Sequence, residues 1–255
     1  MQLQHIRNAT LKIKYAGKTI LVDPMFCEKE AFDPFFPGVG KNPTVNLKMS
    51  VDSIVEDVDA VLLTHAHPDH FDEVAATVLP KNIKLLSTPN DLDFLRNHGF
   101  NNIETIQDKT IWQETTITRI EGQHGSGPVL EFMGKMSGFV LQSINEPTVY
   151  VVGDSILIDN VKEAIKDYQP EIIVTNSGDA IIPGNENNPA IMDEEQTISV
   201  CNMARNSKVI ATHIGAFDFC KVTRRGLRQY AESKGINKEQ LLIPQDGEIL
   251  KFNNG

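Results

Sequence analysis

The sequence predicts a single α/β domain in which short strands run into loops and helices. Short apolar runs, such as 60–63 and the three residues Ile172-Ile173-Val174 within 171–174, have the length of buried strands. Several such runs are followed by segments that can form helices. The 255 residues are 40% hydrophobic and 23% charged, which is ordinary for a soluble globular domain, and no shift in composition marks a linker.

The first half of the chain is expected to open with a β-hairpin. Residues 11–15 alternate apolar and polar side chains, residues 16–18 form the turn, and residues 19–22 form the return strand. Further strands are expected at 59–63, 83–87, 103–106 and 115–121. Helices are expected at 71–79 and from Pro89 to about Gly99, the second capped by Thr88.

The second half has a similar rhythm of strands and loops, without a close sequence repeat. Strands are expected at 139–141, 148–152, 171–174, 208–211 and about 248–252. The patterns Asn160-x-x-Glu163 and Asp193-x-x-Gln196 resemble capping boxes, and each predicts a helix start. A last helix is expected from Thr223 to Gly235, and a loop rich in glycine, asparagine and proline at 176–190.

Residues 25–50 form a long segment without a helix or strand pattern. It far exceeds the usual loop length of about 4–6 residues. Its aromatic residues argue against disorder, and they would be exposed apolar surface unless they cover something: Phe26, Phe32, Phe35 and Phe36. We expect the segment to be an active-site loop that shapes substrate choice. The alternative is a contact between copies of the chain in a homo-oligomer, and the two roles can coexist.

Four potential metal ligands fall within six residues: His65, His67, Asp69 and His70. Pro68 lacks a backbone N–H and disfavours a helix before it, so the stretch is a loop between a strand and a helix. Buried histidines beside an acid would need neutralising partners, and imidazole with carboxylate suits Zn²⁺, Mn²⁺, Fe²⁺ or Ni²⁺. The stretch therefore predicts a metal site at a strand end, where open α/β sheets place their chemistry.

Three further candidate ligands, His124, Asp154 and His213, follow three other predicted strands. Taken singly, each has an ordinary explanation. His124 could be a loop residue, Asp154 a turn or helix-capping acid, and His213 a satisfied core histidine. Their equivalent positions after strands favour a shared site with the histidine-rich loop.

The charge and the cysteine content limit the kinds of binding partner and the cellular compartment that we expect. With 24 Lys and Arg against 34 Asp and Glu, the net charge is −10, which argues against nucleic acid or an anionic membrane as the main partner. A small-molecule substrate is expected, and metal ions would allow even an anionic one. Three widely spaced cysteines favour reduced thiols in the cytoplasm. The N-terminus has no signal-peptide core, and no apolar run approaches the ~20 residues of a membrane helix.

The pattern His65-x-His67-x-Asp69-His70, followed in order by His124, Asp154 and His213, resembles the metallo-β-lactamase superfamily. The resemblance runs from about residue 3 to 250 and includes the strand end at 20–24. It implies a four-layer αβ/βα sandwich, with two mixed sheets between helices. It also implies two divalent metal ions, Zn²⁺ first, with Mn²⁺, Fe²⁺ or Ni²⁺ as alternatives.

The resemblance also implies a role for each ligand. One ion would be held by His65, His67 and His124, and the other by Asp69, His70 and His213, with Asp154 bridging both. Two divalent ions carry four positive charges against two carboxylates, which favours a bridging hydroxide, because a metal lowers the pKa of water from 15.7 to about 7. The implied activity is hydrolysis of a small ester, lactone or phosphoester, with Asp69 and Asp154 as the catalytic carboxylates.

Within the superfamily, the chain is most similar to the cytoplasmic, ascorbate-6-phosphate-lactonase-like branch. This similarity lies in residues 7–10, in Gly153-Asp154-Ser155 and in His213-x-Gly-x-Phe217. The alternative is a mononuclear iron oxidoreductase or a sulfur-handling member of the same fold. Retention of His70, which completes a second site, favours the dinuclear hydrolase.

Overall fold

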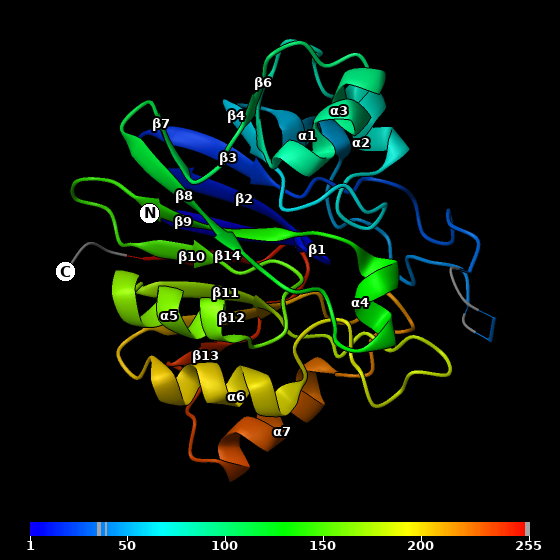
Figure 1. Ribbon diagram of the computed structural model, residues 1–255, viewed down its shortest axis with the longest axis vertical. Helices are drawn as coiled ribbons and strands as arrows, with labels where there is room; N and C mark the ends of the chain where they lie inside the picture. Colours follow the sequence, from blue (N-terminus) through cyan, green and yellow to red (C-terminus); the bar gives the residue numbers. More distant parts are fainter. Residues whose placement is uncertain (35–36, 39, 253–255) are drawn as a thin grey trace.

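Two mixed β-sheets pack face to face in the computed structural model, which describes residues 1–34, 37–38 and 40–252 (Figure 1). The first sheet has seven strands within these residues, in the order β14 (Ile249–Lys251), β1 (Gln2–Arg7), β2 (Thr10–Tyr15), β3 (Lys18–Val22), β4 (Ala60–Leu62), β5 (Lys84–Ser87) and β6 (Ile103–Thr105). The second has the order β13 (Leu241–Leu242), β12 (Lys208–Thr212), β11 (Ile172–Asn176), β10 (Val149–Val151), β9 (Ser137–Gln142), β8 (Thr115–Glu121) and β7 (Lys109–Trp112).

Helices cover the outer face of each sheet, which gives the expected four-layer αβ/βα sandwich (Figure 1). The first sheet is covered by α1 (Val51–Val55), α2 (Glu73–Val78) and the short η1 and α3 (Pro89–Asp91 and Leu92–Asn97). The second is covered by α5 (Asp159–Tyr168), α6 (Glu194–Met203) and α7 (Arg224–Ser233). A further short helix, α4 (Pro128–Met133), lies apart from these layers, directly after His124.

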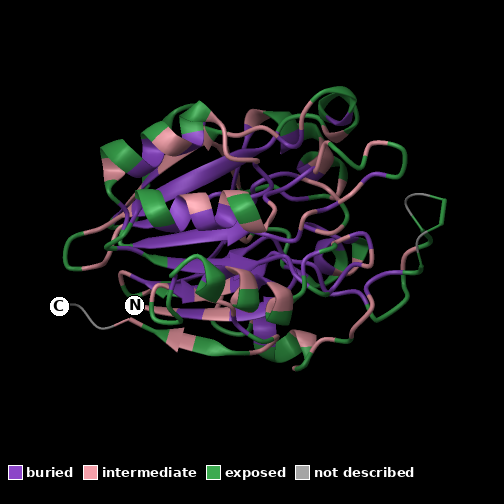
Figure 2. Cartoon of the chain, turned by 90° about the horizontal axis from the view of Figure 1, so that it is seen from below, coloured by how far each residue is buried: buried purple, intermediate pink, exposed green. Residues whose placement is uncertain are grey.

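The pleat of the strands explains how one sheet can have two apolar faces. Successive side chains of a strand point to opposite faces. In β3, Ile20 and Val22 therefore enter the core between the sheets, whereas Leu21 packs under the helices of the first sheet. In β10, Val149 and Val151 likewise face the other sheet, whereas Tyr150 packs under the helices of the second. Strands buried on both faces form the purple centre of Figure 2.

Both sheets have the same pairing pattern, which explains the similar rhythm of the two halves. In the first sheet the pairs from β14 to β3 are antiparallel and those from β3 to β6 are parallel. In the second, the pairs from β7 to β10 are antiparallel and those from β10 to β13 are parallel. Six of the seven candidate ligands follow strands that have a parallel neighbour, β4, β10 and β12, whereas His124 follows β8, whose two neighbours are antiparallel.

Some elements differ from the sequence expectation. The strands β1, β7 and β13 and the helices α1 and α4 were not predicted. The expected capping box at Asn160 is wrong, because α5 already begins at Asp159 and its N-cap, Ile158, forms no side-chain cap hydrogen bond. Asn160 instead donates to the carbonyl oxygen of Glu121 at 3.2 Å. Asp193 and Thr223 do cap α6 and α7 as expected.

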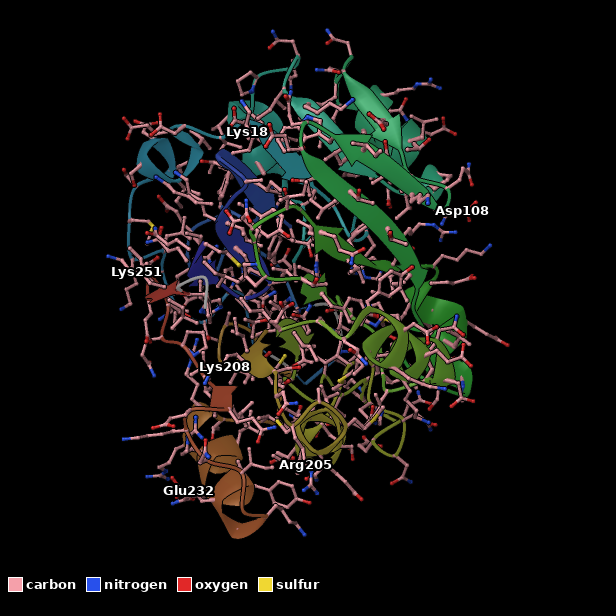
Figure 3. All side chains as sticks on the ribbon, turned by 90° about the vertical axis from the view of Figure 1, so that its left-hand side faces the viewer. Lys18, Asp108, Arg205, Lys208, Glu232 and Lys251 are labelled. Atoms are coloured by element: carbon pink, nitrogen blue, oxygen red, sulfur yellow. The ribbon has the colours of Figure 1, made fainter. Side chains whose placement is uncertain are left out.

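Most charged side chains lie on the outside of the sandwich, as labelled residues such as Lys208 and Glu232 illustrate (Figure 3), whereas Arg7 and a few aspartates are buried. No helix within the described ranges is long and apolar enough to cross a lipid bilayer.

Candidate metal centre

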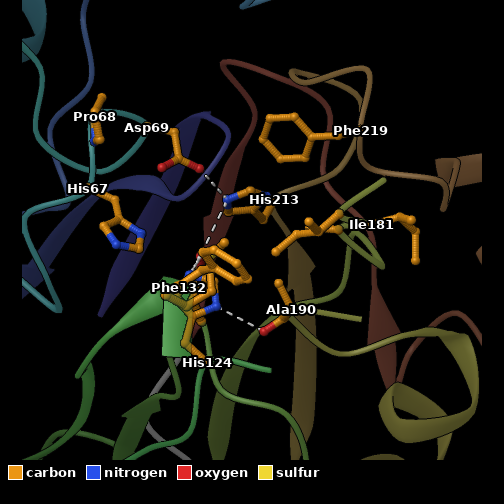
Figure 4. Close-up of a pocket in the computed structure, with 13 residues that line it drawn as sticks. His67, Pro68, Asp69, His124, Phe132, Ile181, Ala190, His213 and Phe219 are labelled. Carbon is orange, nitrogen blue, oxygen red and sulfur yellow. Dashed lines mark hydrogen bonds and ion pairs between the residues drawn. The ribbon is translucent and has the colours of Figure 1, made fainter. Parts of the chain in front are cut away.

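The seven candidate ligands come from four loops at one end of the sandwich. His65, His67, Asp69 and His70 lie in the loop between β4 and α2. His124 follows β8, Asp154 follows β10 and His213 follows β12. The first loop belongs to one sheet and the other three belong to the second, so the residues meet where the two sheets face each other. Figure 4 shows His67 and Asp69 across from His124 and His213.

The structure brings these residues together in two groups. Within each group, the candidate ligand atoms all lie within 4.8 Å of one another. The first group consists of His65, His67 and His124. The second consists of Asp69, His70, Asp154 and His213. This division follows the one implied by the sequence resemblance, with Asp154 inside the second group.

The carboxylate of Asp154 faces both groups. Its Oδ2 lies 3.1 Å from Nε2 of His70 and 3.8 Å from Nε2 of His213, both in the second group. The same oxygen lies 3.3 Å from Nε2 of His124 and 3.9 Å from Nε2 of His65, both in the first. One oxygen therefore lies within 4 Å of ring nitrogens from both groups.

A buried aspartate, Asp23, holds the start of the histidine-rich loop. Its side chain accepts hydrogen bonds from the backbone N–H and the hydroxyl of Thr64, at 2.8 and 2.7 Å. Its Oδ2 also lies 2.8 Å from Nδ1 of His70, which leaves Nε2 of that ring directed at Asp154. A carboxylate on the far nitrogen fixes the tautomer and orientation of a metal-ligating histidine.

Two more aspartates hold the rest of this loop. Asp91 accepts the backbone N–H of Ala66 at 3.1 Å. Asp72 caps α2 by accepting the N–H of Ala75 at 2.7 Å, and its other oxygen accepts the N–H groups of Phe26 and Cys27 at 2.7 and 2.6 Å. The loop is therefore fixed at its middle and at its end.

The remaining histidines also have partners on their far nitrogens. Nδ1 of His124 lies 2.9 Å from the carbonyl oxygen of Ala190, and Nδ1 of His213 lies 3.5 Å from Sγ of Cys220. His213 has a φ of 59°, a left-handed conformation that is costly for a residue other than glycine. Its backbone N–H donates to the carbonyl oxygen of Asn8 at 3.0 Å, which helps to hold it there.

Two asparagines that sequence reasoning missed also contact the centre. Asn176 donates through Nδ2 to Oδ1 of Asp154 at 2.5 Å, and its own Oδ1 accepts the hydroxyl of Thr212 at 2.8 Å. Asn8 donates through Nδ2 to the carbonyl oxygen of Asp69 at 3.1 Å. Both follow or end a strand, as the ligands do. Position at a strand end is thus the sequence signal that could have found them.

The two groups differ in their electrostatics. Burial lowers the pKa of His124 to about 4, and burial together with neighbouring His70 lowers the pKa of His65 well below its usual value. In the second group, burial also opposes a charged ring, but the carboxylates of Asp154 and Asp23 outweigh it and raise the pKa of His70 to about 10. His65 and His124 of the first group thus offer neutral imidazoles, whereas the rings of His70 and His213 in the second group bind protons more strongly.

The carboxylates of the second group are ionised. Burial alone would raise the pKa of Asp69, but the rings of His70 and His213 outweigh it and lower that pKa to about 2. The same two rings hold the pKa of Asp154 well below its usual value, although burial opposes this. Buried carboxylates among buried imidazoles are the donor set of a transition-metal site, and the hydrogen bonds on the far nitrogens have the arrangement such sites use. The residues present therefore fit divalent ions.

A cavity of about 200 Å³ opens onto the candidate ligands (Figure 4). His67, Asp69, His124, Asp154 and His213 form its floor. Its walls are mainly apolar and come from α4, from residues 180–190 and from the loop after His213: Phe132, Met133, Ala180, Ile181, Ile182, Ala190 and Phe219. Among the described lining residues there is no lysine or arginine.

The long segment 25–50 contributes none of the described residues that line this cavity. It packs beside it instead, where Thr44 donates its N–H to the carbonyl oxygen of Ala216 at 2.7 Å, and the rings of Phe32 and Phe217 stack 6.4 Å apart. Phe26 was expected to be exposed unless it covered another part of the protein. It is instead buried in the core under α1 and α2. Phe35 and Phe36 lie outside the described residues.

Comparisons with known proteins agree with this fold. Residues 18–214 match the family model described as a beta-lactamase superfamily domain. The UPF0173 protein YddR of Bacillus subtilis is 36% identical over 260 residues, which cover 99% of this chain and 100% of that protein. A UPF0173 metal-dependent hydrolase of Azorhizobium caulinodans is 22% identical, over 98% of this chain and 100% of its own.

Two solved structures are similar over nearly the whole chain. An isothiocyanate hydrolase from Delia radicum gut bacteria is 35% identical, with a TM-score of 0.92 and 100% of both chains covered. A possible metal-dependent hydrolase from Veillonella parvula is 28% identical, with a TM-score of 0.94 and 99% of both chains covered.

The chain therefore belongs to the beta-lactamase superfamily and, within it, to the UPF0173 family. The similarity to the ascorbate-6-phosphate-lactonase-like branch stays a prediction.

Proposed function

We propose that this chain is a metal-dependent hydrolase that holds two divalent ions, Zn²⁺ first, and acts on a small, uncharged, largely apolar substrate. The observation that carries the proposal is the position of Asp154, whose Oδ2 lies between two groups of histidines on the floor of the cavity. His65, His67 and His124 would hold one ion. Asp69, His70 and His213 would hold the other, and Asp154 would bridge them.

The ions would supply the chemistry that the side chains cannot, by lowering the pKa of water and polarising the group under attack. The residues of the chain position these parts. Asn176 and Asp23 orient Asp154 and His70, as described above. Asp69 is ionised and borders the cavity, so we assign it to orienting the attacking water and accepting its proton.

The walls of the cavity support an uncharged substrate. A phosphoester is an anion, and binding it apart from the ions would require cationic side chains, whereas the described lining residues include no lysine or arginine. Esters, lactones and isothiocyanates are neutral and carry an electrophilic carbon. The similarity to an isothiocyanate hydrolase makes isothiocyanates the first class to test.

The reaction with an isothiocyanate balances without any further reactant. Water adds through its oxygen to the carbon of the N=C=S group, and both of its protons reach the nitrogen. The carbon–nitrogen bond then breaks, which releases an amine and carbonyl sulfide. With an ester or lactone, the same addition ends in cleavage of the carbon–oxygen bond.

We further propose that residues 1–255 act as one domain in the cytoplasm. One domain is supported by the site itself, since its residues come from loops of both sheets. A reducing compartment is supported by the three cysteines, which are all among the described residues and carry free thiols. The segment 25–50 packs on residues 215–218, which directly precede Phe219 in the cavity wall. In this proposal, the segment influences substrate choice through these residues.

The proposal can be tested by a substrate screen on protein reconstituted with Zn²⁺ or Mn²⁺. Isothiocyanates, esters, lactones and phosphodiesters would be compared for the wild type and His65→Ala, with His98→Ala as a control outside the site. We expect turnover of a neutral class that is lost in His65→Ala and kept in His98→Ala. Turnover of phosphodiesters alone would contradict the uncharged substrate. Equal turnover in wild type and His65→Ala would contradict the site.

A further inference from the structure

We propose that α4 is the element that selects the substrate, and that Phe132 on this helix contacts the apolar substituent of the substrate. The inference deepens the proposed hydrolase function and rests on it. It assigns the direct contact with the substrate to a helix that the sequence did not predict, beside the cavity, in addition to the indirect influence of the segment 25–50.

Phe132 is unusual among the apolar side chains of the protein. Its exposed fraction is 72%, although a phenylalanine is normally buried. Single exposed apolar residues are common and need no explanation. Phe132, however, lines the cavity over the candidate metal centre, and Figure 4 shows it in the same close-up as His124 and His213. An aromatic ring at the wall of a concave, mainly apolar cavity is a typical contact for a small ligand.

The backbone around α4 directs this side chain. Gly127 before the helix has a φ of 53° and Gly134 after it has a φ of 70°, so the chain turns sharply at both ends. Between them, Val129 is fully buried and anchors the helix in the core. A Cβ on Gly125 would lie 2.5 Å from the Val129 side chain, so only glycine allows this packing. With Val129 turned inward, Phe132 is left facing outward, beside the cavity.

The helix is also tied to a candidate ligand. The chain runs from His124 to Pro128 in four residues, and Ser126 donates to Oδ1 of Asn188 at 3.0 Å. Ala190, in the same loop as Asn188, accepts the hydrogen bond from His124. The short segment between His124 and α4, together with these two hydrogen bonds, therefore holds Phe132 in place relative to the candidate ligands.

The remaining wall residues define what the substituent must be. Ile181 and Phe219 line the cavity with Phe132, and none of the three carries a charge. These side chains favour binding of an apolar substituent, because they bury its surface and cannot form hydrogen bonds with a polar one. We infer that the preferred substrates carry a benzyl-sized apolar group rather than a methyl group or a charged one.

The test compares kcat/KM for methyl and benzyl isothiocyanate, and for methyl and benzyl substituents on a simple ester. The variants are Phe132→Ala, Phe132→Leu and, as a matched control, Leu130→Ala, which removes an exposed apolar side chain of the same helix outside the cavity. We expect Phe132→Ala to lose about tenfold for benzyl substrates and less than about twofold for methyl ones, since apolar contacts of this size discriminate about 10–200-fold. Phe132→Leu should keep most of the preference, and Leu130→Ala all of it.

A binding measurement separates this inference from the proposed function. Ethanethiol and phenylmethanethiol would be titrated into Co²⁺-loaded protein and followed by the optical spectrum. If no substrate is turned over, the hydrolase proposal fails, but a tenfold weaker binding of phenylmethanethiol to Phe132→Ala still supports the contact. An unchanged preference in Phe132→Ala, an equal loss for both substituents, or a change in oligomeric state without a change in preference overturns the inference.

Discussion

The side chains of the candidate centre are placed by partners that are themselves buried. Asp23 holds His70 and Thr64, and Asn176 holds Asp154. Three non-glycine residues of the site have a positive φ: Asn8, Asp23 and His213. Such conformations cost about 1–3 kcal/mol each and persist where the surroundings impose them. At these three positions, some stability is given up to hold the donors of the site in place.

The first prediction at this scale concerns Asp154. Asp154→Asn keeps the shape of the side chain but removes its charge. Because Asn176 donates to Oδ1, the amide oxygen of the variant will turn to that donor and leave its NH₂ group at the Oδ2 position, facing the ring nitrogens of both groups. We expect weaker metal binding in both groups and loss of most hydrolysis, measured as metal content and kcat. Unchanged metal affinity and activity would remove Asp154 from the site.

The second prediction is that metal binding displaces a ring proton from His70 in the second group but none from His65 or His124 in the first. His70, with a pKa raised to about 10, holds a proton at pH 8, whereas His124, with a pKa lowered to about 4, does not. An ion that binds His70 must displace this proton, whereas an ion that binds His124 finds no proton to displace. The affinity of the second group should therefore fall by about tenfold per pH unit below pH 10 for each proton displaced.

Calorimetric titrations in two buffers with different ionisation enthalpies check this at pH 8. The variant His124→Ala isolates the second group, and we expect it to release one proton or more per ion. The variant His213→Ala isolates the first group, where His65 and His124 hold no proton, so we expect it to release about one proton fewer per ion; any proton from an ion-bound water is common to both variants. Equal release from both variants would contradict the difference in pKa.

At the scale of elements, single polar side chains join the helices to the loops of the site. Asp72 is the clearest example. One of its oxygens caps α2, and the other accepts the two N–H groups that begin the segment 25–50. The segment is ordered over its first residues because its backbone is bonded to the same loop that carries the histidines.

We predict that Asp72→Ala lowers the free energy of unfolding by about 3 kcal/mol, from loss of a helix cap and of two buried hydrogen bonds. Asp72→Asn should lose less, because it keeps one oxygen. Urea denaturation of both variants measures this. If Asp72→Ala lost less than about 0.5 kcal/mol, the buried N–H groups of Phe26 and Cys27 would have found other partners.

Elements also show how far the sequence predicts this structure. The hairpin at 11–22, the caps Thr88 and Asp193 and the helix start near Thr223 carry local signals, and the structure has them as expected. The strands β1, β7 and β13 are edge or near-edge strands with weaker local patterns. α4 is six residues long between glycines, and its only fully buried side chain is Val129. A single anchor gives no periodicity, so tertiary packing alone reveals it.

At the scale of the whole molecule, the centre joins the two sheets. The histidine-rich loop belongs to the first sheet, whereas His124, Asp154 and His213 belong to the second. An ion bound between them therefore links both halves of the sandwich. Anything that binds the folded protein and not the unfolded chain adds to its stability.

We therefore predict that chelation destabilises the whole fold and not only the site. An ion at 100 times its dissociation constant contributes about 2.7 kcal/mol. For a domain of this size that corresponds to a fall in Tm of about 5–10 °C on removal of metal. Differential scanning calorimetry with and without EDTA measures it, and added Zn²⁺ should restore the original Tm. A Tm that does not change on full removal of metal would show that the ions do not bridge the sheets.

The central claim is that one chain holds two ions, divided between the two groups and bridged by Asp154. The most direct measurement is the metal content of reconstituted protein, by plasma mass spectrometry, for the wild type, His124→Ala, His213→Ala and the control His98→Ala. We expect about two ions per chain in the wild type and the control, and about one ion per chain in each of the other two variants. A wild type that never exceeds one ion in excess Zn²⁺ or Mn²⁺, or single variants that keep two, would contradict it.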